Sequence, residues 1–339
     1  MSDNDNVKYS EFLTTKEAAK YLNMSPTTLR NWDKTGKLKA VRNPYNNYRR
    51  YKVEDLNNVL LELNEPRAEY KARNLFTRDI SELKDKVLQG DCLDLMRYIP
   101  DKSIDMILCD LPYGTTQNKW DSLIDLSELW KEYSRVVKPN GAIVLTSQGI
   151  FTAKLILSNE KDFKYKIIWE KSKPTNFLNA KKQPLRKYED VCVFYKKQPT
   201  YNPQMKKGEP YNKGVRKNQL TGSYGDFESQ LVKSDGDRYP TDVVYFKTAE
   251  SEGEVLHPTQ KPVELGRYLV RTYTNEGDLI LDNTFGSGSF LVSAALENRN
   301  FCGIEKNQDV SLFKKESISY IDVAKQRLEK AGYTARIVR

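Results

Sequence analysis

The sequence predicts an α/β domain built on a mostly parallel sheet, preceded by a small α-helical domain of the winged helix-turn-helix type. From residue 87 onward, short apolar runs alternate with segments of helix length, a pattern typical of a sheet buried on both faces. Residues 13–63 instead carry closely spaced helix-start signals, and residues 65–86 are polar and charged. We therefore expect a helix-turn-helix domain over 1–64, a linker over 65–86 and the α/β domain over 87–339.

The first domain opens with two short predicted helices. Thr14, Thr15 and Glu17 form a helix-start signal in which a threonine caps the helix and the glutamate lies in its first turn. Ser25 and Pro26 begin a second helix, because serine is a good N-cap and proline suits the first helical position. A tight turn between two such helices predicts a helix-turn-helix.

The residues that follow resemble the wing of MerR-type regulators and phage excisionases. A basic stretch over 48–51 comes after the second helix, and a further helix begins at Val53. The resemblance implies that the second helix enters the major groove of DNA and that the basic wing binds phosphates. The residues expected at the DNA are Thr27, Thr28, Arg30, Asn31, Arg49 and Arg50. A helical module for protein contacts is the alternative.

The α/β domain contains apolar runs that we interpret as strands. They lie at residues 87–88, 104–109, 141–145, 165–169, 191–195, 279–281 and 301–304. The segments expected to be covering helices lie at 126–137, 263–274, 289–298 and 311–330. Because parallel strands need crossover connections, we expect these helices on the faces of the sheet.

Two polar regions interrupt this pattern. The region from 164 to 187 is basic and rich in amides, which suits a DNA backbone, although a solvated charged loop is the alternative. Its candidate DNA contacts are Lys173, Asn176, Lys181 and Lys182. Residues 197–255 are irregular and rich in side chains that pair with base edges, which predicts a target-recognition insert containing Arg216 and Lys217. A disordered insert is the alternative there.

Composition narrows the class of protein. The net charge of +9 over 339 residues favours a polyanionic partner. No run of about 18 apolar residues occurs, and the N-terminus lacks the features of a signal peptide, so we expect a cytoplasmic protein without membrane contact. Four widely spaced cysteines and a single histidine predict neither a zinc site nor a disulfide framework. We expect the cysteines to be small buried apolar residues.

A glycine-rich turn follows the run at 279–281 and precedes a predicted helix. Gly286 and Gly288 would let the backbone approach a ligand at the carboxyl end of a strand, where a Cβ would clash. Glu305, at the end of the next run, is placed to accept hydrogen bonds from ribose hydroxyls. A dinucleotide site would use the same features, but Leu291 stands where its fingerprint requires a third glycine.

Asp110, Leu111, Pro112 and Tyr113 form a second candidate site after the run at 104–109. An exocyclic base amine is a poor nucleophile because its lone pair is delocalised. Hydrogen bonds to the Asp110 carboxylate and the Leu111 carbonyl would draw the nitrogen toward tetrahedral geometry. Pro112 would stiffen the turn, and Tyr113 would offer a face to a flipped base. The alternative is that Asp110 is a helix cap and Tyr113 belongs to the core.

Together these motifs resemble the permuted beta class of amino-DNA methyltransferases over about residues 86–330. The catalytic tetrapeptide precedes the cofactor loop, and the most diagnostic segment is the hexapeptide His-Pro-Thr-Gln-Lys-Pro at 257–262. The resemblance implies a Rossmann-like sheet that binds S-adenosyl-L-methionine, with Thr259 and Lys261 near the methionine end of the cofactor. The full set of implied cofactor residues is Asp91, Thr259, Lys261, Asp282, Phe285, Gly286, Gly288, Ser289 and Glu305.

The tetrapeptide also bears on the base that is methylated. Family members usually carry two prolines, and Leu111 replaces the first, but the implied role of that position uses only its main-chain carbonyl. The initial aspartate favours N6-adenine in double-stranded DNA, since N4-cytosine relatives usually begin with serine. N4-cytosine methylation, a DNA-binding regulator with an inactive methyltransferase fold and, more distantly, a dinucleotide-dependent enzyme are the alternatives. The sequence leaves open the recognition site, a cognate restriction endonuclease, and whether the enzyme is a monomer or a homodimer.

Overall fold

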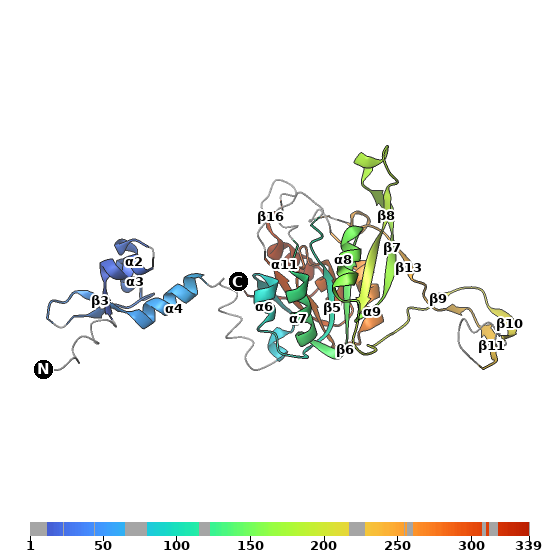
Figure 1. The fold of residues 1–339 in the computed structure, drawn as a ribbon, viewed down its shortest axis with the longest axis horizontal. Helices are drawn as coiled ribbons and strands as arrows, with labels where there is room; N and C mark the ends of the chain where they lie inside the picture. The colour runs from blue at the N-terminus through green and yellow to red at the C-terminus, as the bar shows by residue number, and fades with distance from the viewer. Residues whose placement is uncertain are drawn as a thin grey trace. The chain divides into compact units, whose positions relative to one another are not determined.

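The computed structural model divides the chain into two compact units, residues 1–74 with Arg339, and residues 75–338 (Figure 1). The residues whose structure is described are 12–22, 24–43, 45–64, 80–114, 123–216, 228–253, 255, 260–306, 310–311 and 318–338. Two predicted site residues, Lys217 and Thr259, lie outside these ranges, as does the first half of the diagnostic hexapeptide, residues 257–259.

The first unit has the predicted helix-turn-helix with a wing. Its elements are β1 (Phe12–Thr14), α2 (Thr15–Tyr21), α3 (Pro26–Thr35), β2 (Val41–Arg42), β3 (Arg49–Lys52) and α4 (Val53–Asn64). Thr14 and Glu17 form a reciprocal capping box, and Ser25 caps α3 through the backbone N–H of Thr28. Both predicted helix starts are therefore confirmed. The described strands form an antiparallel sheet in the order β1-β3-β2. Strand β1 was not predicted from the sequence.

The described part of the second unit is built around a nine-stranded sheet in the order β13-β7-β8-β6-β5-β14-β15-β4-β18. The strands are β4 (Lys86–Gln89), β5 (Ile104–Asp110), β6 (Val137–Ser147), β7 (Phe163–Thr175), β8 (Arg186–Phe194), β13 (Val243–Phe246), β14 (Leu279–Asp282), β15 (Asn300–Glu305) and β18 (Arg336–Val338). Neighbouring described strands run parallel except where β8 pairs with β6 and β7. The expected mostly parallel sheet is thus confirmed.

Two rows of helices pack against this sheet (Figure 1). One row comprises α6 (Cys92–Met96), α7 (Leu126–Val136) and α8 (Ile150–Ser158), and the other α9 (Val263–Tyr273), α10 (Ser289–Leu296) and α11 (Tyr320–Lys330). Short 3-10 helices lie at Ile80–Leu83, Phe177–Asn179 and Ala249–Ser251. The four cysteines are buried. None of the described helices is long and apolar enough to span a bilayer.

Two regions differ from the sequence-based expectation. The stretch expected to be a basic loop is largely a β-hairpin, in which β7 and β8 pair as far as Thr175 and Arg186. Apolar periodicity marks only the buried half of these strands, since the outer part is polar and largely exposed and its pairing is irregular between Glu170 and Thr175. The insert expected to be irregular contains short strands β9 (Lys206–Lys207), β10 (Tyr211–Arg216), β11 (Gln230–Ser234) and β12 (Asp237–Arg238). It also supplies β13 to the edge of the central sheet.

The strand order gathers the candidate site residues. β14 lies between β5 and β15 and is parallel to both, although β5 is remote from it in sequence. Asp110, Asp282 and Glu305 are the last residues of β5, β14 and β15, so all three lie at the same edge of the sheet. In an open α/β sheet, this carboxyl edge is where ligands bind.

Candidate active site

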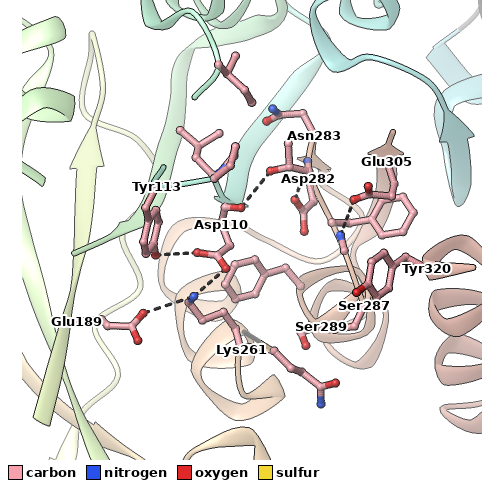
Figure 2. A pocket seen from close by; sticks show the side chains of 18 of the residues that line it. Asp110, Tyr113, Glu189, Lys261, Asp282, Asn283, Ser287, Ser289, Glu305 and Tyr320 are labelled. Atoms are coloured by element: carbon pink, nitrogen blue, oxygen red, sulfur yellow. Dashed lines mark hydrogen bonds and ion pairs between the residues drawn. The ribbon is translucent and has the colours of Figure 1, made fainter. Parts of the chain in front are cut away.

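A cavity of about 650 Å³ lies at the carboxyl edge of the sheet. Its wall includes residues that follow β4, β5, β14 and β15, together with side chains from the β7–β8 hairpin and from Gln260 and Lys261 (Figure 2). The volume falls in the range of pockets that bury a small ligand. The structure therefore brings the predicted tetrapeptide and the predicted glycine turn into one cavity.

Asp110 is held at the wall by hydrogen bonds to both carboxylate oxygens (Figure 2). The Tyr113 hydroxyl donates to Oδ1 at 2.7 Å, and the Thr146 hydroxyl donates to the same oxygen. The Lys261 ammonium donates to Oδ2 at 2.7 Å. The Asp110 carbonyl accepts a bond of 3.1 Å from the Thr284 hydroxyl, which ties the ends of β5 and β14 together. These contacts fix the orientation of the carboxylate toward the cavity.

Lys261 is the centre of a buried row of alternating charges. Its side chain is only 7% exposed and lies between Asp110 and Glu189, with the ammonium 3.4 Å from a Glu189 oxygen. Lys171, also buried, binds the other Glu189 oxygen at 3.2 Å. Burial by itself would lower the pKa of Lys261, but Asp110 and Glu189 outweigh it and raise the pKa above its ordinary value of 10.5. The side chain is therefore a cation at neutral pH.

Sequence reasoning missed Lys171 and Glu189, and it expected Lys261 beside a cofactor rather than on the Asp110 carboxylate. The one available signal was the acidic pair Glu189-Asp190 at the start of an apolar strand, since acids in a buried strand require partners. Asp190 is indeed bound by Lys166 and by the Thr152 hydroxyl.

Tyr113 is fixed as part of the same wall. Burial and the nearby Asp110 carboxylate raise the pKa of its hydroxyl, so the phenol stays protonated and donates its hydrogen bond. Its ring stacks on Phe151 with centroids 5.1 Å apart, and the Lys261 ammonium lies 5.4 Å from the ring centroid. Leu111 and Pro112 also line the cavity.

The glycine turn after β14 forms the opposite wall. Gly286 adopts φ 51°, which favours glycine, and its N–H donates a bond of 2.9 Å to the Glu305 carboxylate (Figure 2). Phe285, Ser289 and Glu305 line the cavity with it. Gly288 does not line the cavity. It packs against α11, where an added Cβ would lie 2.7 Å from the Cβ of Ala324.

Two further acids border this wall. Asp91 caps α6 by accepting the Leu93 N–H at 3.0 Å, and Lys306 lies 3.2 Å from its carboxylate. Asp282 is 2% exposed, and burial raises the pKa of its carboxyl well above the ordinary value. A buried acid with a raised pKa, such as Asp282, is typical of functional sites.

The candidate DNA contacts of the second unit lie on the β7–β8 hairpin and in the insert. Lys181 and Lys182 are exposed near the hairpin tip, and Lys173 is exposed but paired with Glu250 at 3.1 Å. Asn176 lies in the turn after β7. Arg216, at the end of β10, is exposed.

In the first unit, the candidates divide into exposed and structural residues. Thr27, Arg30 and Asn31 are exposed on α3, and Thr28 is half-buried. Arg49 is half-buried and binds Asp33 through its Nε at 2.5 Å, so part of its guanidinium holds the wing to α3. Arg50 is half-buried as well.

Arg42 also binds Asp33, at 3.0 Å. Burial would raise the pKa of Asp33, but bonds from the Ala40 N–H and from Arg49 outweigh it, and the pKa stays below its ordinary value. The buried Asp33 carboxylate therefore joins the wing to α3 through both arginines.

Comparison with known proteins identifies a matching family and several similar proteins. The family model described as DNA methylase matches residues 104–314, more than half of the chain, and the MerR family regulatory protein model matches residues 14–51. Type II methyltransferase M.HinfI of Haemophilus influenzae is 26% identical over 292 residues, which cover 76% of this chain and 71% of the relative. Type II methyltransferase M2.MboI of Moraxella bovis is 27% identical over 270 residues, which cover 71% and 86%. The solved M1.HpyAVI–SAM complex is 21% identical with a TM-score of 0.49, covering 72% of this chain and 98% of that one.

Proposed function

This chain belongs to the DNA methylase family, and on that premise we propose that it methylates the exocyclic N6 amine of adenine at a specific site in double-stranded DNA. The methyl donor of the family is S-adenosyl-L-methionine. The observation that carries the proposal is the Asp110 carboxylate, held by Tyr113, Thr146 and Lys261 at the wall of the cavity that also contains the glycine turn.

The residues of the glycine wall fit the cofactor. Gly286 brings bare backbone to the cavity, and the Glu305 carboxylate beside it is suited to ribose hydroxyls. Asp91, at the end of the same wall, would lie near the adenine, while Asp282, Phe285 and Ser289 would complete the pocket. When bound, the cofactor supplies a methyl group on a positively charged sulfur.

The chain itself supplies geometry and a proton acceptor. The Asp110 carboxylate and the Leu111 carbonyl would accept hydrogen bonds from the two amine hydrogens, which favours a tetrahedral nitrogen. Methylation of the amine releases one proton, which the Asp110 carboxylate would accept. Lys261, Tyr113 and Thr146 keep the carboxylate in position throughout.

The substitution Asp110→Ala tests this assignment. It should abolish methylation of DNA yet leave S-adenosylmethionine affinity within about tenfold, because Asp110 acts on the transition state rather than on the cofactor. Asp101→Ala is the matched control, since that aspartate is exposed and binds only the half-buried Arg135 among the ion pairs of the described residues. Methylation is measured by sequencing that detects modified bases, and cofactor affinity by calorimetry.

The outcomes separate the alternatives. Near-normal turnover of Asp110→Ala would contradict the mechanism. Modified cytosine in DNA treated with the wild-type chain would assign N4-cytosine methylation, for which the amine chemistry is the same. A wild-type chain that neither binds the cofactor nor modifies DNA would indicate a DNA-binding regulator with an inactive fold.

Two further parts of the proposal concern partners. The match of residues 14–51 to the MerR model supports DNA binding through the exposed face of α3, with Thr27, Arg30 and Asn31 toward the groove. The names of the two relatives as type II methyltransferases support a role beside a cognate restriction endonuclease. Co-purification of such a nuclease from the native host tests the second part.

A further inference from the structure

The β7–β8 hairpin connects the cavity to an exposed tip. Thr175, the last residue of β7, and Arg186, the first residue of β8, are paired and line the cavity. Residues 176–185 therefore form a tip immediately beyond the cavity wall. Figure 1 shows the hairpin extending past the neighbouring strands of the sheet.

Two large apolar side chains occupy this tip. Phe177 is 76% exposed and Leu178 is 83% exposed, and they are consecutive in the 3-10 helix Phe177–Asn179. Single exposed apolar residues are ordinary, but an adjacent pair on a projecting turn indicates an interaction surface. Neither side chain contributes to the core of the unit, so packing within the chain does not account for them.

The tip is an ordered turn. Asn176 adopts a left-handed conformation with φ 70°, and its side-chain oxygen accepts a bond of 2.7 Å from the Asn179 amide. Backbone bonds join Asn179 to Asn176, Ala180 to Phe177 and Lys182 to Asn179, at 2.8–3.1 Å. Because these bonds preform the turn, little conformational entropy is lost when the tip binds a partner.

The positive charge around the tip favours DNA as its partner. Lys181 and Lys182 follow the apolar pair after two intervening residues, and Arg186 and Lys187 lie at the start of β8. Basic side chains beside an apolar point are the chemistry of proteins that insert a wedge between DNA base steps while binding the phosphates. A purely apolar protein groove would not require this positive flank.

We propose that Phe177 and Leu178 enter the base stack beside the target adenine and fill the space that the flipped base leaves. This inference rests on the proposed function, because only a base that leaves the duplex creates that space. Phe177 lies two residues beyond Thr175, and at no more than about 3.3 Å per residue it lies within about 7 Å of the cavity wall.

The test compares paired and mismatched substrates with the full chain. The double variant Phe177→Ala/Leu178→Ala is assayed on a duplex containing the sequence that the wild-type chain methylates. A second duplex carries a mismatch opposite the target adenine, which makes flipping easier. We expect kcat/KM to fall at least tenfold on the paired duplex and less than about threefold on the mismatched one. With 2-aminopurine at the target position, the fluorescence increase that reports flipping should be lost.

Two controls separate the wedge from general effects. Leu157→Ala removes a leucine that is 68% exposed on α8 and does not line the cavity, and it should leave both substrates unaffected. Lys181→Gln/Lys182→Gln should weaken binding equally on both duplexes and reduce the salt dependence, as loss of phosphate contacts does. S-adenosylmethionine affinity should be unchanged in every variant.

Three results would contradict the proposal that Phe177 and Leu178 act as a wedge. Equal decreases in kcat/KM on both duplexes would show that the tip contributes to DNA binding in general and not to base flipping. Unchanged kinetics and fluorescence on both duplexes would show that the tip does not act on DNA and binds another partner, such as a protein. A wild-type chain that methylates no duplex would overturn the proposed function and the wedge with it, whereas the first two results leave the proposed function standing.

Discussion

Removal of the buried cation beside Asp110 should have large and separable effects on stability and activity. In Lys261→Met, the aliphatic stem is retained but the ammonium that lies 2.7 Å from Asp110 and 3.4 Å from Glu189 is lost. Glu189 keeps Lys171 at 3.2 Å, whereas Asp110 keeps only its uncharged donors, Tyr113 and Thr146, among the described contacts. The variant therefore leaves one carboxylate without a cation in a partly buried site.

The size of the effect follows from burial. Breaking a buried ion pair by removing one partner destabilises a protein by about 3–5 kcal/mol, because the remaining charge is uncompensated. For a unit of this length, each 1 kcal/mol lowers Tm by about 2–4 °C, so the loss should be about 6–20 °C. The matched control is Lys173→Met, which breaks a 3.1 Å pair with Glu250 whose side chains are 64% and 62% exposed. An exposed pair contributes about 0–1 kcal/mol, so this control should shift Tm by only a few degrees.

The assay is differential scanning calorimetry of the full chain, reading the transition of the unit that contains residues 75–338. The pKa of Lys261 is raised in the folded state, so its contribution is fully present below the ordinary value of 10.5 and is lost as pH rises through the folded value. The gap between wild type and Lys261→Met should therefore be constant near neutral pH and shrink only above about pH 10.5. Methylation should fall with the loss of a positioned carboxylate.

Two results would contradict this reasoning. If Lys261→Met and Lys173→Met melt at the same temperature, the buried row of charges does not stabilise the unit. If Lys261→Met methylates DNA as fast as wild type, the cation does not position Asp110.

Three further predictions address the cofactor wall and the separate roles of the first unit and the insert in DNA recognition. Burial raises the pKa of Asp282 well above its ordinary value, and such an acid destabilises the fold as pH rises above the unfolded value of 3.8. Asp282→Asn should therefore melt at a higher temperature than wild type in thermal scans, with a gap that widens as pH rises above 3.8. Glu305→Gln should weaken S-adenosylmethionine binding by at least about tenfold in calorimetry, because an amide offers the ribose one acceptor fewer, and unchanged affinity would remove Glu305 from the cofactor site. Deletion of residues 1–64 should weaken DNA binding, most visibly at higher salt. The methylated sequence should stay the same, because the insert at 197–255 is expected to select it. A different methylated sequence in modified-base sequencing would mean that the first unit takes part in target choice.

Local sequence signals determine much of this protein. The starts of α2 and α3 could be predicted because a capping box and a serine–proline start involve residues no more than three positions apart. The strands that end at Asp110, Asp282 and Glu305 could be predicted because each is a short apolar run buried on both faces. A parallel sheet then requires these strand ends to share one edge, so the candidate cavity followed from the pattern.

Contacts between distant segments were decided only by the tertiary structure. Nothing local to Lys261 indicates that its ammonium binds Asp110 and Glu189, since those partners come from different strands. Gly288 likewise fits a cofactor loop by its motif, yet its missing Cβ makes room for Ala324 of α11.

The ends of the β7–β8 hairpin strands could not be predicted from the sequence either. Its outer half is exposed on both faces, so no apolar alternation marks it, and only the pairing of Thr175 with Arg186 reveals where the strands end. Periodicity records which side chains are buried, whereas strand pairing and ion pairs depend on which remote segments the fold brings together. The motif residues could therefore be named from the sequence, but the charges that orient Asp110 and the apolar tip beside its cavity required the folded chain.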